Sequence, residues 1–286
     1  MLVSRKGYPH LVGIMQGRLT PPKGRGIQFF PFEEWEEEFR KAAELGLDEI
    51  DLIFDLERYQ ENPLWTDGGI NRINELKGSF DITTSHICAD FFMRRPFFRV
   101  NEKTRWENVK VLERLIFQAA KIEARGIEIP LLDNSSLKTK EEEEILISSI
   151  EECLWPAVAL NVTISLETDL PPVRFRKLLE RFDSHLVGAV YDSGNSSSLG
   201  YDPYEEVTVL KKFVTNIHIK DRVLGGSTVP LGTGSADFGQ LFRGLQRIGY
   251  QGGFALQAAR GEEGKESKNV QEQLVFLKRL ISGYLT

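Results

Sequence analysis

Short apolar runs alternate with longer, charged amphipathic segments along the whole chain. This alternation is typical of repeated βα units built around a parallel sheet. Eight runs predict strands, which is the number that closes a barrel. They are LVGIM from Leu11, EIDLIF from Glu49, ITTSHI from Ile82, IEIPLL from Ile127, VTISLE from Val162, LVGAVYD from Leu186, VTNIHIK from Val214 and GFALQ from Gly253. We therefore expect an α/β fold consisting of one (β/α)8 barrel.

The segments between the runs carry helix start and stop signals. The segment 32–45 has apolar residues at helical spacing and is followed by Gly46, a residue type common just past a helix end. Asp202 followed by Pro203 predicts a capped helix start, and Asp237 predicts another. These signals support the alternation of strands and helices.

The length of the chain and the absence of a linker favour one domain spanning residues 1–286. The chain has 286 residues, whereas single-domain barrels of this class typically have about 250 residues. Length alone would also allow two domains. No low-complexity linker divides the sequence, so a single domain is the simpler interpretation.

Charge and composition narrow the expected partners. The net charge of -6 weighs against a nucleic-acid surface, which needs a basic stripe to neutralise phosphates. The two cysteines, Cys88 and Cys153, lack metal-ligand spacing and fit a reducing compartment. No apolar stretch is long enough for a secretory leader or a bilayer span. We expect a soluble cytoplasmic protein without nucleic-acid or membrane partners; association into a homo-oligomer stays open.

Four runs in the second half of the chain each end in a side chain that can bind a metal. The runs ISLETD, AVYDSGN, NIHIKDR and FALQAAR place Glu167, Asp192, His218 and Gln257 at the carboxyl ends of four successive predicted strands. Parallel barrels build their active sites at that end. A single carboxylate there is more often a solvent-facing loop residue, and a single histidine is more often a hydrogen-bonded core residue. Four such residues together predict a metal site.

The alternation of side chains along a strand supports this interpretation. Glu167 shares a face with Ser165, and His218 shares one with Asn216 and Lys220. The ligand set is rich in oxygen and has one imidazole, which suits one Mn²⁺, Mg²⁺, Co²⁺ or Zn²⁺ ion in an open site. Such an ion could hold two oxygens of a hydroxy-carbonyl compound and promote proton removal at the neighbouring carbon.

The motifs LETD, YDSGN, HIKD and VPLGTG, on this alternating background, resemble the xylose-isomerase-like TIM barrel superfamily. The runs GIMQGRL and TSHICADFF resemble the branch that contains hexulose-6-phosphate isomerase and ketose 3-epimerase relatives. The resemblance implies a metal-dependent isomerase or epimerase of a keto-sugar or sugar phosphate, acting through an enediolate-type intermediate. It also implies that the last four strands supply a Glu, an Asp, a His and a second Glu to the metal, and that the two glutamates exchange the substrate proton.

Gln257 departs from that pattern. It stands where the resemblance places the second glutamate, whereas Glu167, Asp192 and His218 match the other three ligands. A glutamine oxygen can bind a metal, but it cannot carry a proton to and from substrate. The loss of one negative charge should make a bound metal a stronger Lewis acid. A reaction that needs one base, such as aldose–ketose isomerisation or elimination of water, is compatible with this set.

The proton carriers predicted from the sequence are Glu167 as base and His86 or Lys220 as its partner. Lys220 shares the face of His218, although a lysine extending to solvent is an equally valid interpretation. His86 is expected near the end of the third strand, and imidazole titrates near neutral pH.

Polar residues after the first, seventh and eighth strands are candidates for contacts with sugar hydroxyls or a phosphate. They are Gln16, Arg18, Arg222 and Arg260. Each arginine could equally form a structural ion pair. Gly232 and Gly234 of VPLGTG could cradle an anion, although a tight turn is the simpler interpretation.

Three other functions are considered. A dehydratase of the inosose type would use the same fold and metal, and the missing glutamate favours it. A sugar-binding barrel without catalysis would also explain Gln257, although the other ligands are intact. An endonuclease IV-like activity needs a three-zinc cluster with several histidines, and the chain has only four histidines in total.

Overall fold

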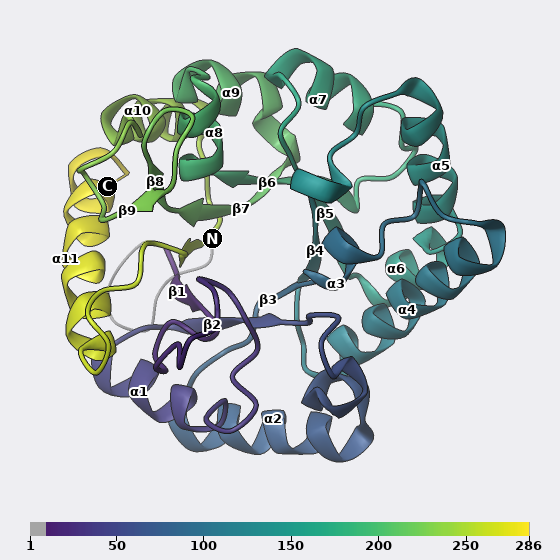
Figure 1. Ribbon diagram of the computed structural model, residues 1–286. Coiled ribbons are helices and arrows are strands. Elements are labelled where there is room, and N and C mark those ends of the chain that lie inside the picture. The colour runs from purple at the N-terminus through teal and green to yellow at the C-terminus, as the bar shows by residue number, and fades with distance from the viewer. Residues whose placement is uncertain (1–9, 286) are drawn as a thin grey trace.

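The fold is known from a computed structural model that describes residues 10–285. Eight parallel strands close into a barrel in the order β1-β10-β7-β6-β5-β4-β3-β2. Figure 1 shows the helices as an outer ring around these strands. The barrel strands are β1 Val12–Met15, β2 Glu49–Ile53, β3 His86–Cys88, β4 Gly126–Leu131, β5 Thr163–Thr168, β6 Val187–Asp192, β7 Val214–Ile219 and β10 Phe254–Leu256. The predicted (β/α)8 barrel is confirmed.

The helices begin and end largely at the predicted signals. Asp202 accepts a hydrogen bond from the backbone N–H of Glu205 at 2.8 Å and caps α9, and Asp237 caps α10 in the same way. The segment 32–45 is only partly helical, because residues 32–36 form turns before α1 begins. The helices are α1 Glu37–Leu45, α2 Asp67–Phe80, α3 Phe91–Arg94, α4 Glu102–Lys121, α5 Lys140–Glu151, α6 Leu154–Leu160, α7 Pro172–Leu179, α8 Ser193–Leu199, α9 Pro203–Leu210, α10 Phe238–Ile248 and α11 Glu266–Tyr284.

The third strand differs from the prediction. Its regular part begins at His86, and the preceding segment is joined to β2 only through a bridge between Glu49 and Thr83. His86 pairs in register with Gly126, the first residue of β4. The prediction that His86 lies near the end of its strand is therefore wrong: the β-branched run from Ile82 suggested an earlier start than the barrel register allows.

The barrel has an apolar shell and a polar interior. Side chains such as Phe39, Leu112 and Phe242 are fully buried among the helices and the outer face of the strands. Inside the barrel, the fully buried polar residues include Glu49, Asp51, Glu128, Asn216 and His218. Buried charges persist only when they are paired or bound to a cation, so this interior indicates a functional constraint.

Between residues 10 and 285, no helix is both long and apolar enough to cross a membrane.

The loop that follows β7 is folded around one carboxylate. It contains the antiparallel pair β8 Asp221–Arg222 and β9 Thr228–Val229. Asp221 is fully buried and accepts hydrogen bonds from the backbone N–H groups of Gly232 at 2.9 Å, Gly234 at 2.9 Å and Ala236 at 3.0 Å. The glycines of VPLGTG therefore bind an internal carboxylate, in agreement with a turn rather than a cradle for an external anion.

Replacement of Asp221 by alanine is expected to destabilise the protein by about 3 kcal/mol, because three backbone N–H groups lose an ionised acceptor. Denaturant unfolding monitored by circular dichroism measures the change. Limited proteolysis should also cut the chain between residues 223 and 236 faster. Asp202→Ala, which removes only a helix cap, is the control and should cost about 1 kcal/mol. Equal effects of the two variants would contradict the role of Asp221.

Candidate active site

A pocket of about 460 Å³ opens at the carboxyl ends of the barrel strands. Its lining includes Gln28, Asp90, Glu167, Asn195, Lys220 and Gln257. A larger hollow of about 1020 Å³ lies at the opposite end of the barrel, around Val214 and Gly252. None of the four predicted metal ligands lines that hollow. The pocket at the strand ends is therefore the candidate active site.

Three of the four predicted ligands meet beneath this pocket. Glu167 lies in β5, Asp192 ends β6 and His218 lies in β7. One ligand atom from each residue lies within 4.8 Å of the other two. Asp192 and His218 are paired in the register of β6 and β7, which accounts for their proximity. The arrangement agrees with the convergence expected from the strand-end positions.

The first turn of α8 orients Asp192. Its Oδ1 accepts hydrogen bonds from the backbone N–H groups of Gly194 at 2.8 Å and Asn195 at 2.7 Å. Its Oδ2 lies 3.4 Å from Nζ of Lys220. One carboxylate oxygen therefore caps the helix, and the other faces Lys220.

Glu128, which the sequence did not single out, orients His218. Its Oε2 lies 3.0 Å from Nε2 of His218 inside the barrel. Nδ1 of His218 is buried without a hydrogen-bond partner among residues 10–285, and it lies 3.7 Å from Oε2 of Glu167. A carboxylate behind a metal-binding histidine commonly fixes which nitrogen is free. The free Nδ1 and the two carboxylates therefore fit a divalent cation.

The electrostatics of the cluster also favour a bound positive charge. Burial acts to lower the pKa of His218, but Glu128, followed by Glu167 and Asp192, raises it to about 10. Burial raises the pKa of Glu167 to about 7, with the charge of Asp192 adding to the shift. The carboxylates therefore stabilise a cation at this position, either a proton on the imidazole or a metal.

Gln257 completes the ring of candidate ligands. It follows β10, and its Oε1 lies 3.3 Å from Nζ of Lys220. Its Nε2 donates a hydrogen bond to Oε1 of Gln28 at 2.9 Å. The carbonyl oxygen, which is the metal-binding atom of an amide, is therefore directed toward the side of the pocket that holds Lys220 and Asp192.

Asn195 links the candidate base to the cationic side of the pocket. Its Nδ2 donates to Oε1 of Glu167 at 2.6 Å. Its Oδ1 accepts from Nζ of Lys220 at 3.3 Å and from Nη1 of Arg222 at 3.0 Å. Sequence reasoning missed Asn195 as a site residue, although its place in YDSGN, three residues after a predicted ligand, was a usable signal.

The residues predicted to bind substrate divide into two groups. Arg18 and Arg222 line the pocket, and each also donates to a backbone carbonyl, Arg18 to that of Ala258 and Arg222 to that of Gly226. Arg260 does not line the pocket and donates to the backbone carbonyls of Gly17, Thr20 and Ile27. Gln16 is fully buried, and its Oε1 accepts a hydrogen bond from the backbone N–H of Ile53 at 2.9 Å. Arg260 therefore holds the segment 17–27, and Gln16 links the end of β1 to β2.

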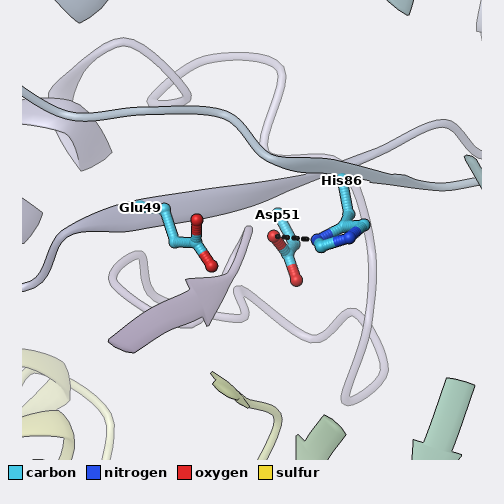
Figure 2. A group of neighbouring side chains, drawn as sticks. All are labelled: Glu49, Asp51 and His86. Atoms are coloured by element: carbon cyan, nitrogen blue, oxygen red, sulfur yellow. Dashed lines mark ion pairs between the residues drawn. The ribbon is translucent and has the colours of Figure 1, made fainter. Parts of the chain in front are cut away.

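His86 lies deeper than the other predicted catalytic residues. Figure 2 shows it directed toward Asp51, with Nδ1 at 3.6 Å from Oδ1 of that residue. Pro130 of β4 is paired with Glu167 of β5. His86 of β3 is paired with Gly126, which lies four residues earlier in β4. Four residues of strand correspond to roughly 13 Å. The structure therefore does not bring His86 to the pocket.

A chain of contacts connects this deeper group to the ligands. Asn216 donates to Oδ2 of Asp51 at 3.1 Å and to Oε1 of Glu128 at 2.8 Å. Burial acts to lower the pKa of His86, but the contact with Asp51 and the charge of Glu128 together outweigh it and raise the pKa. The group formed by Glu49, Asp51 and His86 therefore supports the site from below.

Comparison with known proteins agrees with this geometry. The sequence model of the family described as xylose isomerase-like TIM barrel matches residues 39–280. The chain belongs to this family. The resemblance stated from LETD, YDSGN and HIKD is thereby confirmed.

Individual relatives of this xylose isomerase-like barrel are distant. SgbU of Haemophilus influenzae, whose name carries a provisional assignment as an L-ribulose-5-phosphate 3-epimerase, is 25% identical over 237 residues, which cover 78% of this chain and 83% of SgbU. The structure of D-psicose 3-epimerase from Clostridium cellulolyticum H10 with D-tagatose superposes with a TM-score of 0.75 at 15% identity, covering 95% of this chain and 99% of that chain. The IolI protein with a bound zinc atom gives a TM-score of 0.76 at 17% identity, covering 96% and 99%.

Proposed function

We propose that this protein is a divalent-metal-dependent isomerase or epimerase of a keto-sugar or sugar phosphate. The observation that carries the proposal is the buried convergence of Glu167, Asp192 and the free Nδ1 of His218. Oε1 of Gln257 lies 3.3 Å from Nζ of Lys220, which also contacts Asp192. A divalent cation bound there would polarise adjacent carbonyl and hydroxyl oxygens of the substrate. The IolI structure, which shares this fold and contains a bound zinc atom, supports a metal in this protein.

Glu167 is the proposed base. Asn195 holds one of its carboxylate oxygens at 2.6 Å, and Glu167 lines the pocket. A carboxylate within reach of the substrate can remove and return a proton. Proton removal beside the substrate carbonyl would give an enediolate-type intermediate.

Lys220 is the proposed acid partner. It lines the pocket, and its Nζ lies 3.3 Å from Oε1 of Gln257 and 3.3 Å from Oδ1 of Asn195, the residue that also bonds Glu167. An ammonium group can donate a proton or a hydrogen bond to a developing oxyanion. We favour Lys220 over His86 because His86 is held by Asp51 below the pocket.

Arg18 and Arg222, which line the pocket, are proposed to bind substrate. Arginine binds phosphate through paired N–H donors. The provisional name of SgbU specifies a ketose phosphate, and two arginines on one pocket are consistent with such a substrate. A phosphorylated pentulose or hexulose is therefore the first substrate class to test.

A dehydratase of the inosose type is the second candidate, and Gln257 is the observation that favours it. Elimination of water needs one base on one face of the substrate, which matches a site with a single glutamate. An isomerase product has the mass of its substrate, whereas a dehydratase product has lost water.

Incubation with a panel of ketoses and ketose phosphates in D₂O tests the proposal. Protein loaded with Mn²⁺, Mg²⁺, Co²⁺ or Zn²⁺ should incorporate deuterium beside the carbonyl and give an isomer whose mass differs from that of the substrate only by the incorporated deuterium. Protein stripped with a chelator should be inactive. Loss of water from the substrate would identify the dehydratase, and no isotope incorporation with any metal would contradict both enzymatic assignments.

A further inference from the structure

We propose that Asp90 and Gln28 select an amide over a carboxylate at position 257, through a chain of hydrogen bonds that has only one allowed direction. The inference concerns the fourth ligand of the metal site, and its significance for catalysis therefore rests on the proposed function. The hydrogen-bond chain runs from Asp90 through Gln28 to Gln257. Arg18 also donates a hydrogen bond to Gln28.

The direction of the chain is set at Asp90. Oδ2 of Asp90 accepts a hydrogen bond from Nε2 of Gln28 at 2.7 Å, and Oδ1 accepts one from Sγ of Cys88 at 3.4 Å. Burial raises the pKa of Asp90 to about 6, so at pH 8 the group is ionised and has only acceptors. Gln28 must therefore present its amide nitrogen to Asp90.

The other side of Gln28 is fixed as a consequence. Its carbonyl oxygen accepts from Nε2 of Gln257 at 2.9 Å and from Nη2 of Arg18 at 3.4 Å. Arg18 also donates from Nε to the carbonyl of Ala258 at 3.2 Å, which holds the guanidinium in place. Rotation of the Gln28 amide would place its nitrogen against a guanidinium and its oxygen against an ionised carboxylate. Both contacts favour the same orientation, and the ionised carboxylate of Asp90 at 2.7 Å holds it more strongly than the 3.4 Å contact from Arg18 does.

The chain has a direct consequence for position 257. The residue there must donate to the oxygen of Gln28, and glutamine does so while leaving Oε1 free on the side of Lys220. An ionised glutamate has no donor, so its oxygen would face the oxygen of Gln28. An unsatisfied acceptor pair in a partly buried site is destabilising. Asp90 and Gln28 thus favour a neutral side chain with an oxygen ligand at position 257. Glutamine at this position fits its hydrogen-bond partners and is not merely a glutamate that has been lost.

A double-mutant cycle in the absence of metal tests the inference. The variants are Gln257→Glu, Asp90→Asn and the pair, each unfolded by denaturant at pH 8 with chelator present. Asparagine at position 90 can accept from Gln28 or donate to it, so Gln28 can turn and present its nitrogen to a glutamate. Gln257→Glu is expected to raise the equilibrium constant for unfolding by a certain factor in the wild type. In the Asp90→Asn background we expect that factor to be about tenfold smaller.

The same cycle in a Gln28→Met background separates the hydrogen-bond chain from simple charge repulsion. Methionine removes the relay but leaves the charges of positions 90 and 257 in place, so the coupling should disappear if the relay carries it. Coupling that persists with methionine, or no coupling with Gln28 present, overturns the proposal. If Gln257→Glu alone does not fold but the double variant with Asp90→Asn does, the proposal is supported. If neither of these two proteins folds, the proposal is overturned.

A Mn²⁺ titration by calorimetry connects the cycle to the metal site. Gln257→Glu should bind Mn²⁺ more weakly than the pair with Asp90→Asn does. A wild-type protein that binds no metal would contradict the proposed function and would leave the metal-free cycle valid. A wild-type protein that binds metal but shows no coupling would contradict only the hydrogen-bond chain.

Discussion

Replacement of Glu167 by glutamine is expected to lower kcat by about 10³- to 10⁴-fold, because the reaction loses its base. The amide retains the size of the side chain, and its oxygen can still accept from Nδ2 of Asn195. It cannot accept a proton from substrate. Since position 257 is already an amide, no second glutamate remains among the ligands to take over. Initial rates and deuterium incorporation, both at saturating metal, measure the loss.

Glu206→Gln is the matched control for this change. Glu206 is also buried, its pKa is raised to about 7 mainly by burial, and Tyr191 donates a hydrogen bond to it at 3.2 Å. It does not line the pocket of about 460 Å³ at the strand ends. The control should therefore keep turnover within a few-fold of wild type. A Glu167→Gln protein that retains a tenth of wild-type turnover would contradict the assignment of the base.

The candidate ligands were predictable because, in a parallel barrel, residues at the ends of successive strands lie close together in space. Side chains at the carboxyl ends of neighbouring strands meet at one mouth. Asp192 and His218 lie at paired positions of β6 and β7, and Gln257 follows β10, which pairs with β7. Recognising the strands was therefore sufficient to bring these residues together.

Gln28 was not predictable, because it lies in an irregular segment that tertiary contacts hold. Arg260 bonds three backbone carbonyls of this segment, and Glu38 accepts from the N–H groups of Gly17 and Leu19. Each of these contacts joins residues that no local pattern connects. The position of Gln28 over the pocket, and its effect on Gln257, follow only from the folded structure.

Glu128 was missed for a different reason. Within IEIPLL it looks like a polar residue on an alternating strand, and such residues usually face solvent when one side of a sheet is exposed. Both sides of a barrel strand are buried. Strands β4 and β7 are not neighbours in the barrel, so Glu128 reaches His218 across the interior. This contact depends on barrel closure, which periodicity does not encode.

Replacement of Glu128 by glutamine is expected to weaken metal binding by about 10- to 100-fold, although residue 128 is not itself a proposed ligand. The carboxylate of Glu128 accepts from Nε2 of His218 at 3.0 Å through one oxygen and from Nδ2 of Asn216 at 2.8 Å through the other. Glutamine has a single acceptor oxygen, so its nitrogen would face either the Nε2–H of His218 or the amide nitrogen of Asn216. In either case His218 is held less firmly with Nδ1 toward Glu167. Calorimetric titration with Mn²⁺ measures the loss, and Glu206→Gln should leave the affinity unchanged. Wild-type affinity in Glu128→Gln would show that His218 does not need this carboxylate to present Nδ1.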